Sequence, residues 1–156
     1  MEFSIISEMF EMMEKTTKRI ELTNILVELL KKTPKKIIPN VVYLLQGIIR
    51  PNFEGVELGI AEKLAIRAIS KSAGLPIKKI EDDYRDGGDL GLTASNILKI
   101  KTQTTFTAEK ITVERVYETL FKIAKLEGKG SQDLKMKYIS SLLNDATPLE
   151  AKFVLK

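Results

Sequence analysis

Apolar residues recur at helical spacing in almost every part of this chain of 156 residues, and no other feature limits its fold so strongly. The clearest case is 112–126, where Val, Tyr, Leu and Ile side chains fall on one stripe. The same spacing predicts helices over 3–14, 18–32, 41–49, 77–84 and 132–144, with others ending at Gly74, beginning near Leu90 and following Pro148. The helix at 41–49 is nearly all apolar and is expected in the middle of the domain, and Leu92 is a candidate core residue. We therefore expect a compact all-α domain, and the chain is long enough to bury a substantial core.

Composition narrows the chemistry that this domain performs. The chain has no Cys and no His, which excludes disulfides and thiolate metal sites and removes the commonest metal ligand and general base. A helical enzyme of unknown type is therefore disfavoured. The 25 Lys and Arg exceed the 21 Asp and Glu, and the net charge of +4 permits a polyanionic partner without requiring one.

The location of the protein is also limited by its sequence. No apolar run approaches the roughly 20 residues of a membrane span. Met1 is followed by Glu2 rather than by the basic start of a signal peptide. We expect a cytoplasmic protein with no membrane partner, and a monomer.

A glycine-rich bend leads into one of the amphipathic helices. Pro51 fixes the backbone, Gly55 and Gly59 permit conformations that side chains forbid, and Lys63 follows one turn into the helix. The start of a helix exposes unpaired N–H groups and the positive end of the dipole, so this arrangement favours phosphate binding. The alternative is that the turn needs glycine for geometry alone.

Two further helix starts repeat this arrangement. Thr17 is interpreted as a hydroxyl cap followed by two cations, and Ser131 as a cap after a glycine turn. The alternative is an ordinary capped turn between antiparallel helices. The predicted phosphate contacts, which we expect on one common face, are Thr17, Lys18, Arg19, Gly59, Lys63, Gly130, Ser131 and Lys135.

Two motifs that suggest other ligands do not meet their requirements. The acidic run at 82–89 lacks the alternating carboxylates and final glutamate of a calcium loop, so we interpret it as a solvated turn that caps the next helix. In 128–131 the lysine precedes the glycine, which is not the order of a nucleotide-binding P-loop. Neither calcium nor nucleotide binding is predicted.

The chain also contains a possible internal repeat. A capped helix ends at Thr33-Pro34 and an apolar helix follows, and the same order recurs at Thr147-Pro148. This predicts a pseudo-two-fold arrangement, with coincidence between two common helix endings as the alternative.

Five motifs, taken together and in this order, resemble the N-terminal DNA-binding domain of ATP-dependent DNA ligases, most closely the archaeal enzymes. They are P-x-F-x-G-x-E-L-G-I-x-E-K-L-x-I-x-A-I-S at 51–70, G-D-L-G at 88–91, T-V-x-x-V-Y-x-T-L at 112–120, G-K-G-S at 128–131 and T-P-L-E-A-K-F at 147–153. The resemblance covers nearly the whole chain.

This resemblance implies an all-α domain that binds nicked double-stranded DNA without sequence specificity along the minor groove, in an enzyme that seals nicks in replication and repair. The Lys-x-Asp-Gly motif that becomes adenylylated is absent from these residues. We therefore expect 1–156 to be the N-terminal part of the DNA-binding domain, without catalysis or cofactor of its own. The nucleotidyltransferase and OB-fold domains, with ATP and Mg²⁺, are expected after residue 156.

The segment 99–110 has no apolar periodicity and is expected to be an exposed, flexible loop. Its Gln103 and Phe106 resemble part of the peptide by which archaeal ligases dock on the sliding clamp, PCNA. The match is partial, because Thr107 stands where a second aromatic ring is usual. Phe106 is alternatively a loop anchor on its own domain. A helical interaction module docking on the clamp is thus the alternative function.

Overall fold

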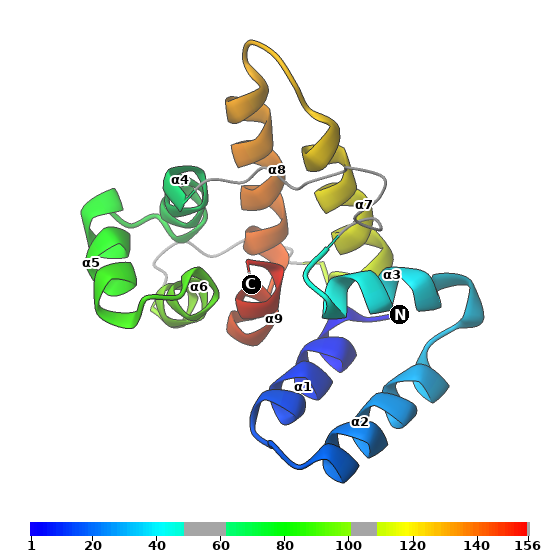
Figure 1. Cartoon of the computed structure of the whole chain (residues 1–156). Coiled ribbons are helices and arrows are strands. Elements are labelled where there is room, and N and C mark those ends of the chain that lie inside the picture. Colours follow the sequence, from blue (N-terminus) through cyan, green and yellow to red (C-terminus); the bar gives the residue numbers. More distant parts are fainter. Residues whose placement is uncertain (49–61, 101–108, 156) are drawn as a thin grey trace.

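The computed structural model describes residues 1–48, 62–100 and 109–155, and every regular element in these ranges is a helix (Figure 1). The helices are α1 (Phe3–Glu14), α2 (Arg19–Lys32), the 3₁₀ turn η1 (Lys35–Ile37), α3 (Ile38–Leu45), α4 (Glu62–Ala73), α5 (Ile77–Gly87), α6 (Leu90–Lys99), α7 (Val113–Lys125), α8 (Ser131–Asp145) and α9 (Pro148–Val154). The predicted all-α class is confirmed. None of the helices in the described ranges is long and apolar enough to cross a membrane.

Local sequence explains where several helices begin and end. The side chains of Asp89 and Thr112 accept N–H bonds in the first turns of α6 and α7. Thr147 forms a reciprocal capping box at the start of α9. Gly74 and Gly88, both with φ near +70°, follow α4 and α5 in the left-handed conformation that glycine adopts without strain.

The core forms where α4 packs on α8 and α6 packs on α9, while α1 joins α9 from the other side. The backbones of α6 and α9 approach closely, because a Cβ atom on Gly91 would lie 2.4 Å from the carbonyl oxygen of Lys152. Between α4 and α8, the buried hydroxyl of Ser140 donates to the carbonyl of Ala68 at 3.3 Å. Small residues therefore set the spacing at both contacts.

An ion-pair cluster joins α9 to α1. The ammonium of Lys152 lies 2.8 Å from a carboxylate oxygen of Glu11 and 2.8 Å from one of Glu14. The hydrogen bond from Lys152 to Glu11 lowers the pKa of the Glu11 carboxyl below its usual value, and the positive charges of Lys152 and Lys15 act in the same direction. The partial burial of Glu11 opposes this effect but is weaker.

Three details differ from the sequence predictions. The apolar stretch 41–49 was expected to form a central helix, but α3 lies at the margin of the molecule with only Val41 buried among its residues (Figure 1). The run expected to be a solvated turn continues α5 to Gly87, helped by an Arg85–Asp82 pair on consecutive turns. Leu92, a candidate core residue, is 40% exposed.

The predicted repeat has a counterpart in the contacts between helices. Helix α3 packs on α7, and α9 packs on α1, which is the exchange that a two-fold relation between α1–α3 and α7–α9 requires. The pseudo-two-fold arrangement itself stays a prediction.

Candidate nucleic-acid interface

The turn between α1 and α2 presents a helix start without a side-chain cap. Lys18 is the N-cap residue of α2, and no side chain bonds to the N–H groups of the first turn. The hydroxyl that accepts a bond in this turn belongs to Thr16, which receives the N–H of Lys18 at 3.2 Å. The prediction that Thr17 caps α2 is therefore wrong. Thr17, Lys18 and Arg19 are all exposed.

The ion pair at this turn is solvent-exposed and weak. The ammonium of Lys18 lies 3.6 Å from a carboxylate oxygen of Glu21, and both side chains are more than half exposed. An exposed ion pair of this kind contributes ~0–1 kcal/mol. A phosphate that replaced Glu21 as the partner of Lys18 would therefore displace little stabilisation.

A second uncapped helix start lies at the turn between α7 and α8. Gly130 is the N-cap residue of α8, with φ of +84°, and the helix has no side-chain cap. Ser131 begins the helix with its side chain buried, so its predicted role as the cap is wrong. Lys135 is only 7% exposed, which does not favour its predicted contact with phosphate. The exposed cation at this turn is Lys129.

The first turns of α4 lie against α8. Lys63 is exposed in the first turn of α4, and one turn later the guanidinium of Arg67 lies 3.7 Å from a carboxylate oxygen of Asp133 in the first turn of α8. This contact joins the α4 cations to the helix start at Gly130. Gly59 lies outside the described residues.

The starts of α2 and α8 do not lie close together. The α1–α2 turn is at the bottom of the molecule in Figure 1 and the α7–α8 turn is at the top. Sequence reasoning missed Arg67 and Lys129. Arg67 follows Lys63 at the i, i+4 spacing of one helix face, a signal that would have identified it.

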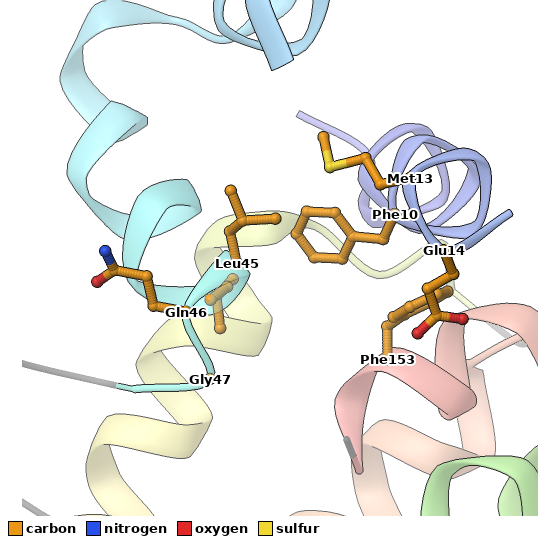
Figure 2. Close-up of a pocket in the computed structure, with 8 residues that line it drawn as sticks. Phe10, Met13, Glu14, Leu45, Gln46, Gly47 and Phe153 are labelled. Atoms are coloured by element: carbon orange, nitrogen blue, oxygen red, sulfur yellow. The ribbon is translucent and has the colours of Figure 1, made fainter. Parts of the chain in front are cut away.

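One hollow in the described residues has a mainly apolar lining. It has a volume of about 350 Å³ between α1, α3 and α9 (Figure 2). Leu45 of α3 faces Phe10 of α1 across it, and Phe153 of α9 packs edge-on against Phe10 with ring centroids 5.5 Å apart. Its lining offers no cluster of polar groups for chemistry. No group of acidic residues suited to a metal ion occurs in the ranges that the structure covers.

Comparison with known proteins decides the family. A family model described as "DNA ligase N terminus" matches residues 2–156. The chain belongs to this family. Among curated members of the DNA ligase family, it is 73% identical to a DNA ligase of Nitrosopumilus maritimus and 62% identical to one of Cenarchaeum symbiosum, each over the whole chain and 26% of that relative. It is 46% identical to a probable DNA ligase of Aquifex aeolicus, over 26% of its length.

The chain thus spans about a quarter of the length of the curated ligases that it matches. Family membership confirms the resemblance inferred from the five motifs. It does not test the individual contact residues, which stay predictions. Gln103 and Phe106, the predicted clamp contacts, lie outside the described residues.

Proposed function

We propose that this chain binds nicked double-stranded DNA through its phosphates, as the N-terminal DNA-binding part of an ATP-dependent DNA ligase. The observation that carries the proposal is that two of the uncapped helix starts, those of α2 and α8, have exposed cations in the turns that the sequence predicted, in a member of the ligase family. Unpaired N–H groups at a helix start, with a lysine or arginine beside them, are suited to an oxyanion of the DNA backbone.

Such contacts position DNA without identifying its sequence. Phosphates are the same at every step, so binding by these groups is nonspecific and depends steeply on salt. This suits a ligase, which must act at a nick in any sequence. Nick sealing, with ATP, Mg²⁺ and an adenylylated lysine, is assigned in this proposal to the remainder of the ligase polypeptide.

The separation of the two turns supports contact at spaced points on the duplex. Helix α8 alone, with 15 residues, is ~22 Å long at 1.5 Å per residue. Two turns at opposite ends of the molecule cannot close on one phosphate. They suit phosphates some distance apart along the same DNA, which fixes the orientation of the domain on the duplex.

The test removes charge at one turn and compares a matched change elsewhere. The double variant Lys18→Gln, Arg19→Gln removes two cations at the start of α2. Lys31→Gln, Lys32→Gln removes two exposed cations from the last turn of α2, away from any helix start. Binding of nicked duplex is measured by fluorescence anisotropy between 50 and 200 mM salt.

Each phosphate contact contributes about 0.9 to the slope of log K against log salt concentration. The Lys18, Arg19 variant should therefore lower the magnitude of that slope by about 1.8, while the Lys31, Lys32 variant changes it much less. Equal losses in the two variants would show that only net charge matters and would refute the assignment of this turn.

A further inference from the structure

A carboxylate stands at the same position in both candidate helix starts. Glu21 is the third residue of α2, and Asp133 is the third residue of α8. Their side chains are 51% and 70% exposed. An acid in the first turn stabilises a helix through the helix dipole, which is the ordinary reason for this placement. At a surface that binds phosphates, a fixed negative charge also repels the ligand.

At α8 the carboxylate pairs with a cation from another helix. The guanidinium of Arg67 in α4 lies 3.7 Å from a carboxylate oxygen of Asp133. The side chain of Arg67 is 46% exposed, so the two groups can separate without opening the packing of α4 on α8. Arg67 is thus an accessible cation whose partner in this structure is an exposed acid.

At α2 the carboxylate is held by two neighbours in the preceding turn. The ammonium of Lys18 lies 3.6 Å from one oxygen of Glu21, and the hydroxyl of Thr16 donates a hydrogen bond to the other oxygen. In the described residues, no side chain caps the first N–H groups of α2 or of α8. Each acid therefore pairs with a cation beside the helix start and leaves the N–H groups themselves open.

A carboxylate and a DNA phosphate compete for the same cations. Each carries one negative charge and accepts hydrogen bonds from lysine or arginine. An exposed ion pair is weak, so a phosphate can displace the acid from its cation. The displaced acid stays close to the bound phosphate, because both lie within one turn of the helix start. Their repulsion then lowers the affinity for DNA.

We propose that Glu21 and Asp133 are intramolecular competitors of DNA phosphate, which pair with Lys18 and Arg67 in the free domain and limit its affinity for duplex DNA. This inference rests on the proposed function and adds the residues that restrain it. The restraint keeps binding readily reversible. Reversible binding suits a ligase, which must leave each nick once it is sealed.

The experiment replaces each acid by its amide. Glu21→Gln and Asp133→Asn are compared with wild type by fluorescence anisotropy of nicked duplex over the salt range used above. Each variant should bind about two- to fivefold more tightly at the lowest salt, the range set by an exposed ion pair. The gains should multiply in the double variant, because the two turns are at opposite ends of the molecule (Figure 1). They should shrink as salt rises, since salt screens exposed charges.

Two controls remove an acid from an exposed ion pair elsewhere. Glu28→Gln opens the pair with Lys32 in the later turns of α2, and Asp82→Asn opens the pair with Arg85 in α5. Each control changes the net charge by the same amount, and neither acid lies in the first turn of its helix. Both should alter the affinity much less. Equal gains in the test and control variants overturn the proposal.

A double-mutant cycle tests whether the competition acts through the cation. Asp133→Asn should raise the affinity much less in an Arg67→Gln background than in wild type, because the acid then has no cation to withhold. A gain of the same size in both backgrounds indicates general repulsion and also overturns the proposal. Thermal unfolding excludes a stability effect. Both acid variants should melt at or below the wild-type temperature, since a first-turn acid stabilises its helix.

The outcomes separate this inference from the proposed function. A wild-type chain that does not bind nicked duplex removes both. A wild-type chain that binds, with a smaller salt slope in Lys18→Gln, Arg19→Gln but no gain on removal of either acid, removes only this inference.

Discussion

The close approach of α6 and α9 makes Gly91→Ala a sharp test of the packing. The substitution adds a Cβ atom 2.4 Å from the carbonyl oxygen of Lys152, whereas real Cβ atoms essentially never lie closer than 3.0 Å to such an atom. The two helices must separate by at least 0.6 Å, the difference between these distances, and the obstacle is backbone rather than a flexible side chain. Overpacking of this kind costs about 1–3 kcal/mol.

Helix propensity acts in the opposite direction. Gly91 lies within α6, where alanine is favoured over glycine by up to ~1 kcal/mol. Taking ~3 kcal/mol for the backbone clash leaves a net loss of about 2 kcal/mol. For a chain of this size, that corresponds to a fall in Tm of about 4–8 °C.

The control is Gly87→Ala, near the end of α5. The added Cβ atom would meet a methyl group of Leu92 at 3.6 Å, an ordinary contact. This variant should match or exceed the wild type in stability, since only the propensity gain remains. Both are measured by thermal and urea unfolding followed by circular dichroism at 222 nm. A Gly91→Ala protein as stable as the wild type would refute the close contact of α6 with α9.

Two further predictions concern the attachment of α9. Lys152→Met removes the cation shared by Glu11 and Glu14 and should cost about 1–3 kcal/mol at pH 7, between the values for exposed and buried ion pairs. Because the folded state lowers the pKa of Glu11, this stabilisation is present above the unfolded carboxyl pKa of about 4.3 and is lost as pH falls through the folded value. Urea unfolding of wild type and variant should therefore differ at pH 7 and converge near pH 3; a constant difference would argue against the ion pair as its cause. Thr147→Ala should cost ~1 kcal/mol by removing the capping box with Glu150, whereas Thr147→Ser retains an acceptor hydroxyl and should stay near wild type in thermal unfolding.

Helical spacing predicted the elements well where one face is strongly apolar. Helices α1 and α7 begin and end within a residue of the predicted ranges, and α4 ends before Gly74 as expected. The failure at α3 has a physical cause. Its sequence is apolar on all sides, which predicts burial, but burial also requires neighbours, and local sequence does not specify which neighbours are present.

At the candidate interface, the sequence predicted the turns at which α2 and α8 begin, but not the residues that occupy the cap positions. The uncapped starts of α2 and α8 occur at the predicted turns, yet neither Thr17 nor Ser131 is the cap. The burial of Lys135 could not be foreseen, because it depends on the packing of α4, which contacts α8 at Asp133 and Ser140 and is far away in sequence. The distance between the two turns is likewise a property of tertiary packing.

The shallow anchoring of α2 has a thermodynamic consequence. With Leu29 as its only buried residue, undocking of this helix exposes little apolar surface and is inexpensive in free energy. An anion bound by the N–H groups at the start of α2 binds the folded helix and not the frayed one. Anion binding and the folding of α2 are therefore linked equilibria. Ligand binding at one end of α2 would then rigidify the helix along its length, as far as the residues that precede α3.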